Sequence, residues 1–203
     1  MKLYNGIGAP NPRKVRIFIA EKGIDVPRVD LDLQAGAART PDFLAKNALG
    51  GTPIIELDDG TVITESVAIC RYLEDLHPTP PLFGSDVVSR AKVEMWNRRM
   101  EIEVMNVCGA IALHTFEFFK TRLTQIPAVA EASKARMPQV WAWLDKELSD
   151  GRPYLAGDSF SMADITGMCT TKLAEFTGTP VPDDLSHVSA WNARLRDRPS
   201  WEA

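Results

Sequence analysis

The residues from Gly50 to Ser66 combine side-chain and backbone types that can hold a small anionic peptide. Pro53 heads an apolar run, and a proline is tolerated at the first residue of a strand because it donates no ladder hydrogen bond. A cis Thr52-Pro53 bond would leave the backbone N–H and C=O of Thr52 free to pair with an extended ligand. At the other end of the segment, Ser66 can bind a ligand carboxylate at a helix start while Glu65 binds an ammonium. The segment therefore predicts a site for a ligand end that carries both charges.

A hairpin and a helix are expected to position these residues. Asp59-Gly60 marks a tight turn, because glycine takes a positive φ without steric cost, and the residues after it return as an antiparallel strand. After Ser66, apolar residues recur at helical spacing and predict a buried stripe made of Val67, Ile69, Cys70 and Leu73.

Together, these motifs resemble the glutathione-binding half of the cytosolic glutathione transferases. The resemblance implies that Thr52, which precedes a cis Pro53, pairs its backbone with the cysteinyl unit of glutathione. It also implies that Glu65 and Ser66 hold the γ-glutamyl group. For either motif alone the alternative is purely structural, with Pro53 ending a loop and Glu65-Ser66 capping a helix.

The order of the predicted elements indicates two domains. Strand and helix patterns alternate before the hairpin, at about residues 2–4, 12–22, 28–31 and 41–46, with Gly23 closing the first helix. Prolines cluster near residue 80 and form a stiff linker, after which only helical periodicity remains. We therefore expect an α/β domain over residues 1–78, a Pro-rich linker at 79–84 and an all-helical domain over 85–203. The resemblance identifies the first domain as thioredoxin-like.

In the second domain, a long helix is predicted from about residue 87 to about Phe119. Another covers residues 137–148, where Pro138 implies either a kink or a helix start. Ser161 and Asp164 form a capping box at the start of a further helix, and the apolar pair Phe160 and Ile165 staples across the turn. This capping box also resembles the folding signature of the family's helical domain, so we interpret Asp164 as structural.

Glutathione reacts as a thiolate, so the protein must supply a hydrogen-bond donor to its sulfur. In the family this donor comes from the loop after the first strand, where Ala9 here occupies the serine position and no cysteine is present. The Pro10-Asn11-Pro12 pattern resembles the bacterial nu-like group and its fungal relatives, in which the asparagine lies beside the sulfur. Alternatively, Asn11 is the N-cap of a helix that has Pro12 at its first position. The two roles are compatible, and Tyr4 is a lesser candidate donor.

The glycyl carboxylate of glutathione needs a cation or backbone donors. Family members often have Lys or Gln where Gly51 stands, so Arg39 or Lys46 is the candidate replacement. The co-substrate pocket is expected between the domains, with possible lining residues on the long helix: Trp96, Arg99, His114, Phe116 and Phe119.

Composition excludes several classes of partner. A net charge of −4 and the absence of a polybasic run argue against nucleic acid and membrane surfaces. No apolar stretch reaches the roughly 20 residues of a membrane span, and the N-terminus lacks a signal-peptide core. The three cysteines lie among apolar residues, which predicts buried free thiols in a cytoplasmic protein, and three histidines do not support a metal site.

The expected function is transfer of glutathione to a small hydrophobic electrophile, a detoxifying reaction, by a homodimer that uses glutathione as co-substrate and no metal. A second hypothesis is glutathione-dependent disulfide reduction without a protein cysteine, which the Pro-Asn pattern favours. A third is a weakly catalytic glutathione- or ligand-binding protein, favoured by Ala9 and Gly51.

Overall fold

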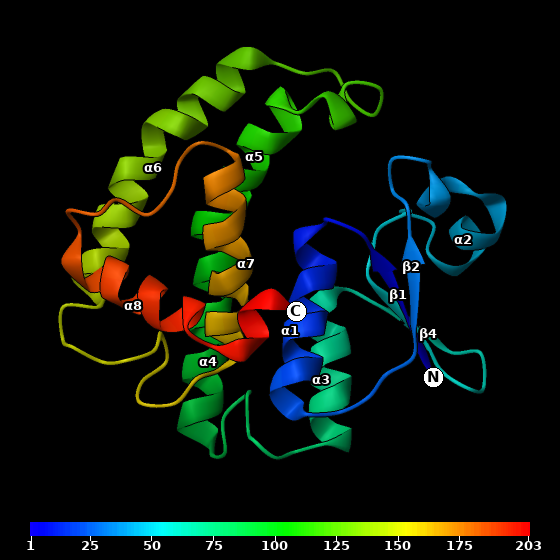
Figure 1. The fold of residues 1–203 in the computed structure, drawn as a ribbon, viewed down its shortest axis with the longest axis horizontal. Helices are drawn as coiled ribbons and strands as arrows, with labels where there is room; N and C mark the ends of the chain where they lie inside the picture. Colours follow the sequence, from blue (N-terminus) through cyan, green and yellow to red (C-terminus); the bar gives the residue numbers. More distant parts are fainter. The chain divides into compact units, whose positions relative to one another are not determined.

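The computed structural model describes residues 1–203, which divide into two compact units (Figure 1). The first unit comprises Met1–Leu82 together with Glu202–Ala203, and the second comprises Phe83–Trp201.

The first unit is a four-stranded mixed sheet covered by helices. Its elements are β1 (Lys2–Gly6), α1 (Pro10–Lys22), β2 (Arg28–Leu31), the 3-10 helix η1 (Ala37–Arg39), α2 (Pro41–Lys46), β3 (Ile54–Glu56), β4 (Val62–Thr64) and α3 (Ser66–Leu76). The strand order is β2-β1-β3-β4. β1 is parallel to β2 and antiparallel to β3, and β3 is antiparallel to β4. The predicted thioredoxin-like α/β class is confirmed.

α1 and α3 lie side by side (Figure 1) and bury apolar stripes on one side of the unit. The predicted stripe of α3 is buried at Ile69, Cys70 and Leu73, whereas Val67 is only partly covered. A second cluster is centred on Ala38, Phe43 and Ile54, and is joined by partly buried Tyr4, Leu31, Leu33 and Val62.

The start of α1 differs from the sequence prediction. The helix begins at Pro10, and its N-cap is Ala9, whose backbone is extended (φ −87°, ψ 143°). Proline at the first helical position is favourable because its fixed φ suits the helix and its missing N–H is not needed there. Asn11 is therefore the second residue of the helix, and its interpretation as the N-cap is wrong. The predicted end is confirmed, since Gly23 adopts φ 61° directly after Lys22.

The second unit is helical, apart from an isolated bridge between Tyr154 and Gly157. Its elements are α4 (Val87–Arg99), the π-helix η2 (Met100–Met105), α5 (Asn106–Thr115), the 3-10 helix η3 (Glu117–Phe119), α6 (Pro127–Glu147), α7 (Met162–Phe176), α8 (Ser186–Arg196) and the 3-10 helix η4 (Pro199–Glu202), whose last residue belongs to the first unit. None of these helices, nor those of the first unit, has the length and apolar content needed to cross a bilayer.

The two long helices differ from their predicted limits. α4, η2 and α5 follow one another directly, so helical backbone runs from Val87 to Thr115 and stops where Phe116 becomes extended. Pro138 lies inside α6, so the alternative in which the helix starts at this proline is wrong. The lost backbone hydrogen bond is offset by burial of α6 side chains on both sides of the proline, including Met137 and Trp141.

The three cysteines are free and buried, as predicted. Burial raises the pKa of the Cys108 thiol to about 11, so it is protonated at neutral pH.

Candidate ligand-binding site

The sheet register brings three of the predicted site segments to one edge. β1 ends where β3 begins, since Tyr4 pairs with Ile54, and β4 ends at Thr64, which pairs with the same Ile54. A Cβ atom on Gly6 would lie 2.3 Å from Thr52 Oγ1, so Thr52 packs directly against the end of β1. Three segments therefore lie at this edge of the sheet: the loop from β1 to α1, the segment that leads into β3, and the start of α3.

The backbone polar groups of Thr52 have no backbone partner within the chain. The Thr52-Pro53 peptide bond is cis, Pro53 is buried, and β3 begins at the following residue. Thr52 is only half-buried and forms no backbone hydrogen bond within the chain. An extended ligand can therefore pair with both its N–H and its C=O.

The loop before Thr52 is braced by a polar network that includes Arg39. Asn47 Nδ2 donates to the carbonyl of Gly51 at 2.9 Å, and Arg39 Nη1 donates to the carbonyl of Leu49 at 3.2 Å. A Cβ atom on Gly50 would lie 2.7 Å from Arg39 Nη1, so the guanidinium lies along this loop. The other candidate cation, Lys46, is instead paired with Glu56 at 3.0 Å. Arg39 is exposed.

Glu65 and Ser66 form the start of α3. Glu65 is exposed, and its backbone has φ 66° and ψ 119°, the one positive φ of a non-glycine residue in the chain. Such conformations cost about 1–3 kcal/mol and concentrate at ligand sites. The Glu65 side chain makes no capping hydrogen bond, while Ser66 is buried at the first helical position. The carboxylate of Glu65 is thus free to meet a ligand group.

The start of α1 offers few hydrogen-bond donors. Prolines at positions 10 and 12 have no N–H, and the N–H of Arg13 donates to the Ala9 carbonyl at 3.3 Å. The backbone N–H of Asn11 is therefore the one free main-chain donor of this first turn. The Asn11 side chain is exposed and does not cap the helix, so its amide is also available.

Tyr4 is used elsewhere. Its hydroxyl donates to Glu56 Oε2 at 2.6 Å, and its ring packs edge-on against Phe43 with 6.1 Å between centroids. Hydrogen bonds from Tyr4 and Lys46, with Lys2 nearby, lower the pKa of Glu56 to about 2. Tyr4 is therefore a packed strand residue whose hydroxyl is bonded to Glu56, which does not favour it as a donor to sulfur.

Asp164 lies in the second unit and accepts four hydrogen bonds. Its Oδ2 accepts from Ser161 N at 3.0 Å and Ser161 Oγ at 2.9 Å, and its Oδ1 accepts from Leu155 N at 2.9 Å and Trp191 Nε1 at 3.0 Å. Burial raises the pKa of this carboxyl group, and the four donors oppose that shift. The two contacts beyond the capping box could not be inferred from sequence spacing.

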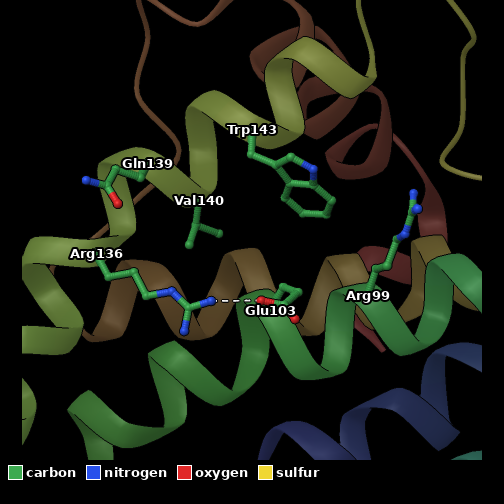
Figure 2. Close-up of a pocket in the computed structure, with 6 residues that line it drawn as sticks. All are labelled: Arg99, Glu103, Arg136, Gln139, Val140 and Trp143. Carbon is green, nitrogen blue, oxygen red and sulfur yellow. Dashed lines mark hydrogen bonds and ion pairs between the residues drawn. The ribbon is translucent and has the colours of Figure 1, made fainter.

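A separate open pocket of about 440 Å³ lies between α6 and the α4–η2 segment (Figure 2). Arg136 bridges the two helices through Glu103 at 2.7 Å, and the Trp143 ring stacks on Trp96 with centroids 6.1 Å apart. The lining residues are Arg99, Glu103, Arg136, Gln139, Val140 and Trp143. Two guanidinium groups and one carboxylate make this pocket a poor match for a small apolar electrophile.

Of the five residues expected to line a co-substrate pocket, only Arg99 lines this one. Trp96 is buried. His114 Nδ1 accepts from Ile126 N at 3.2 Å and so ties the end of α5 to the start of α6. Trp143 and Arg136 were missed because aromatic and charged residues at helical spacing give no signal of a pocket. No group of three or more His, Cys, Asp or Glu side chains is arranged to hold a metal ion.

Two family models match the chain: "Glutathione S-transferase, N-terminal domain" over residues 1–75 and "Glutathione S-transferase, C-terminal domain" over residues 105–199. Glutathione S-transferase 2 of Saccharomyces cerevisiae is 35% identical, over 98% of this chain and 87% of that protein. The crystal structure of a glutathione S-transferase domain-containing protein of Marinobacter aquaeolei VT8 is 39% identical, with a TM-score of 0.91 and coverage of 99% of this chain and 100% of that one. The crystal structure of Gtt2 from Saccharomyces cerevisiae gives a TM-score of 0.91 at 34% identity, with coverage of 100% of this chain and 99% of that one. The chain therefore belongs to the glutathione S-transferase family.

Proposed function

We propose that this protein is a glutathione transferase, which joins the sulfur of bound glutathione to a small hydrophobic electrophile. The observation that carries the proposal is the convergence, at one edge of the sheet, of an unpaired Thr52 backbone, the Glu65-Ser66 helix start and the first turn of α1. These groups match the extended backbone, charged end and thiol of one tripeptide.

Each part of glutathione is assigned a partner. The cysteinyl backbone pairs with Thr52 and is shaped by Pro53, while the γ-glutamyl ammonium meets Glu65. Its carboxylate binds Ser66 and the N-terminus of α3, where unpaired N–H groups favour an anion. Arg39 is the cation for the glycyl carboxylate, since Lys46 is already paired with Glu56.

The chemical step requires a thiolate, because a free thiol with a pKa near 8.5 is mostly protonated at neutral pH. The backbone N–H and side-chain amide of Asn11, together with the N-terminus of α1, stabilise the anion as the thiol proton leaves to water. The sulfur lone pair then forms a bond to the electrophilic carbon, and the leaving group departs with its own electron pair. The protein contributes positioning and a lowered thiol pKa.

The domain division at 1–78, 79–84 and 85–203, a homodimeric assembly and a cytoplasmic location belong to the same proposal. Buried free cysteines support the location, because disulfides are rare in the reducing cytosol. Neither disulfide reduction nor ligand binding without catalysis is favoured by a structural observation, and the relatives described above are named glutathione S-transferases.

Glutathione-agarose retention and turnover of an aryl halide test the proposal directly. We expect retention, release by free glutathione and conjugate formation, with slower turnover of a small disulfide. Retention without conjugation of any electrophile in a panel would support the binding-protein alternative instead. Faster disulfide reduction than conjugation would support the second alternative.

The donor to sulfur is tested at position 11. Asn11→Ala removes the side-chain amide but keeps the backbone N–H, whereas Asn11→Pro removes both in a helical first turn that tolerates proline. If the backbone N–H dominates, Asn11→Ala keeps most of the depression of the bound-thiol pKa and Asn11→Pro loses it. If both variants leave the bound-thiol pKa and turnover unchanged, Asn11 does not stabilise the sulfur.

A further inference from the structure

The side-chain amide of Asn5 is hydrogen-bonded through both its oxygen and its nitrogen, and it links β1 to α1 and β2. Its side chain is buried, with 4% of the residue exposed. Asn5 Oδ1 accepts from Arg16 Nη1 of α1 at 2.5 Å, and Asn5 Nδ2 donates to Asp30 Oδ1 of β2 at 2.6 Å. Asp30 in turn pairs with Arg28 Nε at 2.9 Å. From this network we infer that Asn5 and Arg16 are positioning residues, which hold the first turn of α1 in register with the thiol of bound glutathione. The inference rests on the proposed function.

Asn5 is connected to two of the segments that are proposed to contact glutathione. Asn5 directly precedes Gly6, whose backbone is packed against Thr52. Arg16 lies in the second turn of α1, in the helix whose first turn carries Asn11. One amide therefore connects the segment proposed to hold the glutathione backbone with the segment proposed to stabilise its sulfur.

Apolar packing alone does not set the position of α1 along its own axis. Much of the buried face of the helix is apolar, including Val15, Ile17 and Phe18, and hydrophobic contacts are non-directional. Buried Lys22 restrains the other end of α1, since it pairs with Glu74 at 2.5 Å and donates to the His77 carbonyl at 2.7 Å, but it is the last residue of the helix and lies far from the first turn. The hydrogen bond from Arg16 to Asn5 is charge-assisted and directional, and Asp30 holds the amide from the other side. The loop offers weaker restraint, with a bond from Ile7 N to the Leu31 carbonyl at 3.1 Å.

A small movement of α1 would affect the thiolate more than binding. Glutathione would still be held by Thr52, Glu65 and Ser66, none of which belongs to the network. The sulfur, however, depends on donors at the start of α1, and misplacing a reacting group by about 1 Å can cost up to about 100-fold in rate. Loss of Arg16 should therefore lower kcat and raise the bound-thiol pKa while changing the Kd for glutathione little.

The test compares Arg16→Gln with Arg28→Gln. Both remove one guanidinium from the same network, but Arg28 is half-exposed and touches only its outer end. We expect Arg16→Gln to lower kcat about tenfold, in line with a sub-ångström displacement, and to move the bound-thiol pKa toward that of free glutathione. The thiolate is followed by its ultraviolet absorbance, and Arg28→Gln should match the wild type in both measurements.

If Arg16→Gln is not folded at the assay temperature, Arg16→Lys carries the test, because it keeps the charge but loses the geometry of the guanidinium. It should shift the bound-thiol pKa in the same direction by a smaller amount. A folded Arg16 variant with wild-type kcat and bound-thiol pKa overturns the positioning role, as does an equal effect from Arg28→Gln. A wild-type protein that does not bind glutathione overturns the proposed function, and this inference with it.

Discussion

Replacing Asp164 with alanine should destabilise the protein without altering the proposed glutathione site. The fully buried carboxylate accepts four hydrogen bonds, two of them from groups distant in sequence, Leu155 N and Trp191 Nε1. Each buried donor left unpaired costs about 1–3 kcal/mol. Loss of the capping contact to Ser161 adds about 1 kcal/mol, and relief of the carboxylate's own desolvation offsets part of the total.

The expected loss is about 3–5 kcal/mol, the range typical of leaving a buried polar cluster without one partner. For a chain of this size, such a loss lowers Tm by about 6–20 °C. Circular dichroism at a fixed heating rate measures the change. Glutathione affinity, measured well below Tm, should equal that of the wild type, because Asp164 contacts only residues of the second unit.

Asp158→Ala is the matched control, because it removes the same charge from an exposed residue close by in the chain. Its effect on the free energy of unfolding should stay within about 0.5 kcal/mol. Ser161→Ala should lie between the two, since it removes only one of the four hydrogen bonds. The reasoning is refuted if Asp164→Ala is no less stable than Asp158→Ala, or if folded Asp164→Ala has lost its affinity for glutathione.

Three further predictions concern the first unit. Because the pKa of Glu56 is lowered to about 2 in the folded protein, from 4.5, its stabilising contribution is present above pH 4.5 and is lost as the pH falls toward 2; the Tm difference between wild type and Glu56→Gln should shrink over that window. Gly6→Ala places a Cβ atom 2.3 Å from Thr52 Oγ1, so calorimetry should show weaker glutathione binding, and unchanged affinity would contradict the packing of Thr52 at the site. Glu65→Gly relieves the strain of the positive φ, and this gain roughly balances the extra flexibility of glycine in the unfolded state, so Tm should change little. The Kd for glutathione should rise at least about tenfold, because the carboxylate is lost. Glu65→Gln keeps the backbone strain but also loses the carboxylate, so it should weaken binding to a similar extent.

Much of the first unit could be predicted because its signals are local. One predicted strand range and one predicted helix range agree with the structure at both ends: β2 at Arg28–Leu31 and α2 at Pro41–Lys46. The turn at Asp59-Gly60 and the end of α1 at Gly23 depend on which residues accept a positive φ, and that is a property of a few neighbouring positions. The start of α1 was misplaced because Pro10 and Pro12 both suit a first helical turn, so local preference alone did not separate them.

The site residues show the same limit. Thr52, Glu65 and Ser66 could be proposed from their spacing, because a proline-headed strand and a helix start have short sequence patterns. Asn11 carries the one free backbone donor of its turn, and this could not be predicted because it depends on the exact start of α1. The hydrogen bond from Tyr4 to Glu56 could not be predicted either, because it depends on the register of two strands whose bonded residues lie more than 50 positions apart in the chain.

The sequence by itself determined the class of ligand, the α/β unit followed by helices, and the residues that shape the approach to β3 and the start of α3. Periodicity, turn residues and caps act over a few positions, so they can be recognised without the fold. Only the tertiary structure decided that Lys46 pairs with Glu56 while Arg39 lies along the loop before Thr52. It also decided how Asp164 is held by Leu155 and Trp191, and that one buried amide links α1 to the sheet. These features depend on which distant side chains meet, and that is set by packing and strand register rather than by any local pattern.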